Sequence, residues 1–266
     1  MAQPLLTVPD LEVARLVARE FEDALTRRGR EQRGPFYAAT LWVDEVYGYF
    51  AFNTADQGDY ELRRARFTML AEHELNGPAF RWYSGDWSTQ PERFLSPETT
   101  DTLAPLTLFV NDDSIELEAI EPVWARWHTI AYAAVRQVRI PTNLQTTPDF
   151  LVYVERDNIG LVDNAEDMLR TIPAGRFHEA IPAWRQLAVV ARAARDDPAI
   201  MARVRQQAAA DAMFPKTPDS ARFPFLHQPA PDELTAHLRS CGLNWHHMVE
   251  WSGMGRAIAI ADTARS

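Results

Sequence analysis

The sequence feature that most constrains the fold is an apolar and aromatic run at positions 36–43, Phe-Tyr-Ala-Ala-Thr-Leu-Trp-Val. Apolar residues occupy both odd and even positions of this run, so a strand formed from it buries both faces and lies inside a sheet. A second aromatic run follows at 48–53, after a short polar stretch at 44–47. This spacing predicts a β-hairpin whose first strand is central.

Helical patterns flank the hairpin. An apolar stripe predicts a first helix that opens at Pro9-Asp10 and is closed by Gly29. The other expected elements are a helix at 57–76, a long helix that ends near Val138, a buried strand at 149–155 and a short helix that ends before Pro173. The order predicts an α+β protein, with a mainly antiparallel sheet of about four to six strands packed by helices. A doubly wound fold would need regular βαβ units instead.

The sequence changes character after Pro173, where alanine and arginine become frequent. We therefore expect an α+β domain at 1–173 and a helical extension at 174–266. Five prolines fall within residues 214–231 of the extension, which predicts an extended arm there.

Charge and composition narrow the partners and the compartment. The formal net charge of −10 disfavours direct nucleic-acid binding and favours an encounter with basic partners. Cys241 is the single cysteine, which fits a reducing compartment, and no signal peptide is visible. No apolar run approaches the roughly 18 residues of a membrane span. These features predict a cytoplasmic protein with no membrane contact.

No catalytic or cofactor motif has the spacing that its chemistry requires. His246 and Glu250 would share one helix face, but the metalloprotease pattern needs two histidines four residues apart. An exposed polar helix face is the alternative explanation for this pair. We expect no catalytic set, no cofactor and no metal.

Aromatic residues near the hairpin suggest a binding surface, because tryptophan and tyrosine dominate interface hot spots. Acidic neighbours would add charge to it, and Asp86 would orient an arginine of a partner. The predicted binding residues are Asp44, Glu45, Tyr47, Tyr49, Trp82, Tyr83, Asp86 and Trp87. Core packing of a twisted sheet under helices is the alternative role for the aromatic members.

Several of these segments resemble the bacterial domain-of-unknown-function family 4303 over roughly residues 8–173. The resemblance lies in the run 36–44, the Asn53-Thr54 strand end, Arg81-Trp82 with Trp87 downstream, and 149–154 followed by the helix end at Ile172-Pro173. It carries over no catalytic residues. It implies a candidate immunity protein of polymorphic-toxin neighbourhoods.

Two functional hypotheses follow. The first is a non-enzymatic binding protein, of immunity type, that neutralises a basic toxin or another protein partner. The alternative is an enzyme or small-molecule-binding protein whose site lies between the sheet and the Trp82–Trp87 segment, with Glu72, His73 and Asp86 as its polar groups. The sequence predicts no oligomeric state.

Overall fold

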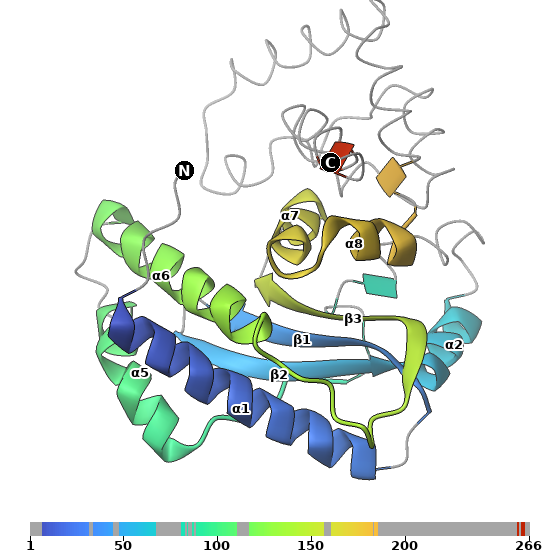
Figure 1. Cartoon of the computed structure of the whole chain (residues 1–266), viewed down its shortest axis with the longest axis horizontal. Helices are drawn as coiled ribbons and strands as arrows, with labels where there is room; N and C mark the ends of the chain where they lie inside the picture. Colours follow the sequence, from blue (N-terminus) through green and yellow to red (C-terminus); the bar gives the residue numbers. More distant parts are fainter. Residues whose placement is uncertain are drawn as a thin grey trace, which may run out of the picture. The chain divides into compact units, whose positions relative to one another are not determined.

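The computed structural model describes residues 7–31, 34–44, 48–67, 81–82, 84, 87, 89–110, 117–156, 161–182, 184–185, 260 and 262–263 (Figure 1). The chain divides into two compact units. The first comprises residues 1–65, 84–159 and 167–173, and the second comprises 66–83, 160–166 and 174–266. Most of the predicted helical extension, its arm at 214–231, His246 and Glu250 lie outside the described residues, so these predictions remain predictions.

The first unit contains a sheet with the strand order β2-β1-β3. β1 (Phe36–Asp44) pairs with β2 (Tyr49–Asp56) as an antiparallel hairpin, which confirms both the hairpin and the central first strand. Gly48 takes a positive φ of 65° in the turn, a conformation that glycine adopts without steric cost.

The α+β class is confirmed, but the expectation of a mainly antiparallel sheet is wrong. β3 (Thr146–Arg156) pairs with β1 in parallel, so the sheet is mixed, and it has three strands in the described part of the chain. The reason is the long connection from β2 to β3. It returns the chain to the end of the sheet where β1 begins, and Phe36 pairs with Thr146 there. A hairpin turn, in contrast, can only reverse the strand direction.

Three helices pack together beside the sheet: α1 (Val8–Arg30), α5 (Pro97–Val110) and α6 (Leu117–Val135), as Figure 1 shows. α1 begins with a capping box, in which Thr7 and Asp10 each accept a hydrogen bond from the other's backbone N–H. Its apolar stripe joins one face of the sheet and α6 in a single core. That core includes Val17, Phe21, Leu25, Leu41, Phe50, Phe52, Trp127 and Ile130.

The remaining helices are short. α2 (Gln57–Arg66) follows β2 directly, and the rest of the helix expected at 57–76 lies outside the described residues. α7 (Leu161–Thr171) and α8 (Ala174–Ala180) follow β3 and are separated near Pro173, the predicted helix end. In the second unit, the buried His178 of α8 lies within hydrogen-bond distance of the Ile260 carbonyl, at 3.0 Å.

Candidate ligand-binding face of the sheet

The two faces of the sheet differ in chemistry. Alternate side chains of a strand point to opposite faces, and Leu41, Phe52 and Val154 join the helix-packed core. On the opposite face the cross-strand partners Asn53, Thr40 and Tyr153 form one line across β2, β1 and β3. All three have 0% exposure. We call this line the polar row.

A carboxylate lies beside the polar row. Glu155, two residues after Tyr153 on β3, is 1% exposed, and its Oε1 accepts the backbone N–H of Ser84 at 2.9 Å. Burial, the Glu155 charge and the neighbouring Tyr37 all raise the pKa of Tyr153 well above its ordinary value. The Tyr153 phenol therefore stays protonated and remains a hydrogen-bond donor at physiological pH.

An arginine lies at the end of this face that is away from Glu155. Arg63 of α2 is buried, donates to the Tyr37 hydroxyl at 3.0 Å and pairs with Asp59 at 3.1 Å. Tyr37 reaches this face because β1 has a register shift between Phe36 and Ala38. The bulge changes the alternation of the strand, so that Phe36 remains in the core while Tyr37 contacts α2.

Residues 84, 87 and 89–92 together contact all three strands. Ser84 binds Glu155 of β3, and the Trp87 ring packs edge-on against Tyr37 of β1, with centroids 6.1 Å apart. Further along, Glu92 exchanges two backbone hydrogen bonds with Phe52 of β2, at 2.8 and 2.9 Å. We call residues 84, 87 and 89–92 the covering segment.

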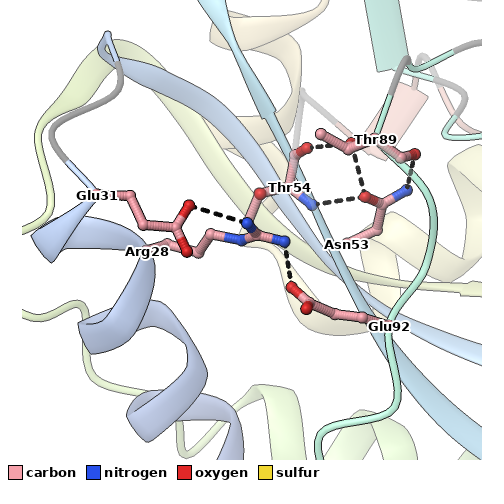
Figure 2. A network of polar contacts seen from close by, with 6 residues as sticks. All are labelled: Arg28, Glu31, Asn53, Thr54, Thr89 and Glu92. Atoms are coloured by element: carbon pink, nitrogen blue, oxygen red, sulfur yellow. Dashed lines mark hydrogen bonds and ion pairs between the residues drawn. The ribbon is translucent and has the colours of Figure 1, made fainter.

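Figure 2 shows how the far end of the covering segment is held. Asn53 Oδ1 accepts the Thr54 N–H at 2.9 Å and lies 2.8 Å from Thr89 Oγ1, while Asn53 Nδ2 donates to the Thr89 carbonyl at 3.3 Å. Arg28, at the end of α1, forms ion pairs with Glu31 and Glu92 (Figure 2). The Arg28 guanidinium also lies 5.7 Å from the centre of the Phe52 ring, within cation–π range.

Thr40, at the centre of the polar row, has a buried hydroxyl for which the described part of the chain provides no hydrogen-bond partner. An unsatisfied buried hydroxyl costs about 1–3 kcal/mol. Valine has the same shape as threonine and would avoid that cost. The hydroxyl therefore marks a place where a polar ligand or water can bind.

The structure places four of the predicted binding residues, and three of these are buried. Trp87, in the covering segment, is 4% exposed, and Trp82, in the second unit, is 3% exposed. Asp44 is also buried. Burial stabilises large aromatic rings such as those of Trp82 and Trp87, because these rings gain most from leaving water. The binding role of the three residues stays a prediction.

Tyr49 is the predicted residue that remains partly exposed. It packs against Trp42 with ring centroids 5.7 Å apart, and the Arg93 guanidinium lies 4.7 Å from its centroid. Glu45, Tyr47, Tyr83 and Asp86 lie outside the described residues, as do Glu72 and His73 of the alternative hypothesis. Their roles stay predictions.

Sequence reasoning missed the polar row and Glu155. A signal was present, because Thr40 interrupts an apolar run, and Asn53 and Glu155 each follow one directly. The missing information was the register, which places residues from strands over 100 positions apart beside one another, as in the pair Thr40 and Tyr153.

Within the described residues, no group of three or more histidine, cysteine, aspartate or glutamate side chains is placed to hold a metal ion. None of the helices in the same residues is long and apolar enough to cross a membrane.

Comparison of the chain with protein-family models, curated proteins and solved structures finds no match.

Proposed function

We propose that this chain is a binding protein for a small polar molecule and that the polar face of the sheet is its binding site. The observation that carries the proposal is the polar row, three fully buried polar side chains in line across three strands. Buried polar groups are costly unless they are hydrogen-bonded. The opposite face of the same strands, in contrast, contributes apolar side chains to the core.

The chemistry of the face suits a ligand with several hydrogen-bonding groups. Thr40 supplies a hydroxyl that both donates and accepts, and the Tyr153 phenol and the Glu155 carboxylate make the surroundings of that hydroxyl polar. Trp87 and Tyr37 add aromatic surface at the covering segment. Small-molecule sites combine apolar walls with a few such polar groups.

The test is a thermal-shift screen of the full chain against a defined panel of amino acids, sugars, nucleosides, polyamines and hydroxy acids. A ligand that prefers the native state must raise the melting temperature. We expect Thr40→Val to stay folded and to lose the shift that the best ligand gives the wild type. Thr100→Val, at an exposed site on α5, is the matched control and should keep that shift. Equal shifts in the wild type and Thr40→Val would contradict the proposal.

A second candidate function is an immunity-type protein that neutralises a basic toxin or another basic protein. The net charge of −10 favours it, since opposite charges steer association. Its test is co-expression with the product of the adjacent gene, scored for rescue of growth and for co-purification that weakens with salt. If the two proteins neither co-purify nor rescue growth, that product is excluded as the partner.

A further inference from the structure

A buried histidine connects two distant segments of the second unit. His178 of α8 is 1% exposed, and its Nε2 lies 3.0 Å from the Ile260 carbonyl oxygen and 3.1 Å from Thr263 Oγ1. These partners are more than 80 positions further along the chain. We call residues 260, 262 and 263 the docked segment. The contact lies in the second unit, whereas the polar row lies in the first, and it has no part in the function proposed above.

The hydrogen bonds of this contact require one particular form of the ring. The Thr263 hydroxyl donates its proton to the Ile260 carbonyl at 2.6 Å, so toward the ring its oxygen can only accept. Both neighbours of Nε2 are therefore acceptors, and Nε2 carries the proton of the neutral ring. Nδ1 is then unprotonated, and the described residues offer it no hydrogen-bond partner.

A second proton on the ring does not suit this environment. It would bind at Nδ1, which is buried and has no acceptor, and it would place a positive charge away from water. The surroundings are apolar, because the Phe177 ring centroid lies 5.0 Å from that of the imidazole and Ile260 is 3% exposed. The docked segment is therefore compatible with the neutral ring and not with the imidazolium.

The charged groups near the contact do not compensate for such a proton. Arg185, which follows α8, has the same sign as the imidazolium. On α8 itself, Arg176 pairs with Glu179 at 3.1 Å, and Asp262 of the docked segment is exposed. Burial is the main cause that lowers the pKa of the histidine, Arg185 adds to it, and the hydrogen bond to the docked segment opposes both.

We propose that His178 is a proton-controlled latch, which holds the docked segment on α8 at neutral pH and releases it in acid. Release lets water surround the imidazolium and accept a hydrogen bond from Nδ1. The docked state is favoured above the ordinary pKa of histidine, 6.5, and this preference is lost as the pH falls from there through the lower pKa of the docked ring. Release is a local opening, because it breaks the contacts of one segment and leaves the rest of the fold in place.

The test is hydrogen exchange of the full chain at pH 7.5, 6.5 and 5.5, with each rate divided by the intrinsic rate at that pH. We expect the protection of the amides of the docked segment to fall by up to about tenfold for each pH unit below 6.5. The amide of Ile172, bonded to the Met168 carbonyl in the first unit, should keep its protection. Equal protection of the docked segment at the three pH values overturns the proposal.

A pair of histidine variants separates the proton from the hydrogen bond. His178→Gln retains an N–H for the docked segment but cannot titrate, so the protection of that segment should not change with pH. His128→Gln, at the other histidine of the described residues, is the matched control and should show the pH dependence of the wild type. If His178→Gln responds to pH as the wild type does, another group controls the segment and the latch is refuted.

A measurement on the wild type keeps the proposal testable if His178→Gln does not fold. The NMR signal of the His178 ring, followed from pH 8 to pH 5, reports when the ring binds its second proton. This titration should have the same midpoint as the loss of protection in the docked segment. A ring that becomes protonated while the segment stays protected overturns the proposal.

Discussion

The Tyr132 hydroxyl lies 2.5 Å from Asp167 Oδ1, and both residues are buried. Burial and the adjacent carboxylate raise the pKa of Tyr132, so the phenol remains a donor at any physiological pH. A hydrogen bond to a charged group contributes about 1.5–3 kcal/mol. The pair thus links α6 to α7 through a strong contact.

We expect Tyr132→Phe to lower the free energy of unfolding by about 1.5–3 kcal/mol, because Asp167 then loses a donor inside the protein. Urea denaturation measures the change. A double-mutant cycle with Asp167→Asn separates the pair from its surroundings. A coupling energy near zero would show that the contact does not stabilise the fold.

Glu20 of α1 holds the start of α5 by the same principle. Its carboxylate accepts the Ser96 N–H, the Ser96 hydroxyl and the Thr99 hydroxyl, at 2.5, 2.6 and 2.6 Å. Burial raises the pKa of Glu20, but these three hydrogen bonds outweigh it and leave the pKa below its ordinary value. The contribution to stability is therefore present above the pKa of the unfolded chain and is lost as the pH falls through the folded value.

Glu20→Gln should therefore lower the stability of the protein at pH 7 but not at acidic pH. The amide keeps the shape but lacks the charge and one acceptor, so we expect a loss of about 1–2 kcal/mol at pH 7 that disappears at acidic pH. Urea denaturation at pH 7 and pH 3 checks this. Glu12→Gln, exposed on the same helix, serves as the control. A loss of equal size at both pH values would contradict the electrostatic explanation.

Gly29 illustrates how far the sequence could predict the fold. The sequence predicts that this glycine closes the first helix, but α1 continues to Arg30. A Cβ atom at Gly29 would lie 2.9 Å from the Asn143 carbonyl oxygen, so the residue permits a close approach of the chain before β3. Helix periodicity is local and was visible in the sequence, whereas a contact over more than 100 residues was not.

The same limit explains the sheet and the site. Apolar patterning in 36–44 predicts β1 and its central place, because a strand that is buried on both faces has apolar residues at odd and even positions. Nothing in the sequence of β3 states whether it runs parallel or antiparallel to β1. The polar row exists only once that register is fixed, so its members looked like isolated polar residues within separate strands.

Two glycine-to-alanine substitutions should change the stability of the protein in opposite directions. Gly29→Ala forces a Cβ against the side-chain amide and the carbonyl oxygen of Asn143, and we expect a loss of about 1–3 kcal/mol. Gly175→Ala, also in a helix, meets nothing within 4 Å and should gain up to about 1 kcal/mol from helix propensity. Thermal denaturation of the two variants compares them. A gain at Gly29 would mean that the residues around 143 shift freely.

The anchoring of the covering segment predicts a local effect. Asn53→Ala removes the side chain that holds Thr89, so the backbone amides of Thr89, Gln90 and Glu92 should exchange with deuterium more rapidly. The amide of Phe36 at the start of the central strand β1, bonded to Gln145, should exchange as before. Asn143→Ala, which removes an exposed side-chain contact to Thr26, is the control. Unchanged exchange at 89–92 in Asn53→Ala would show that the backbone pairing of Phe52 and Glu92 suffices.

The stability of the second unit should depend on pH through His178. His178 is buried, its Nε2 lies 3.0 Å from the Ile260 carbonyl and 3.1 Å from Thr263 Oγ1, and its Nδ1 has no partner in the described residues. A carbonyl only accepts, so Nε2 carries the proton and the neutral ring is the form that fits.

Burial, with a smaller contribution from Arg185, lowers the pKa of His178 below 6.5, although the Ile260 hydrogen bond opposes the shift. Near pH 6.5 the unfolded chain therefore binds a proton at this histidine, whereas the folded chain does not. The free energy of unfolding consequently falls as the pH drops below about 6.5, and it levels off below the folded pKa. His178→Gln retains an N–H for Ile260 but cannot titrate. Urea denaturation at half-unit steps from pH 8 to pH 4.5 should show a shallower acid-side slope for His178→Gln than for the wild type. Identical slopes would mean that His178 does not set the acid limit of this unit.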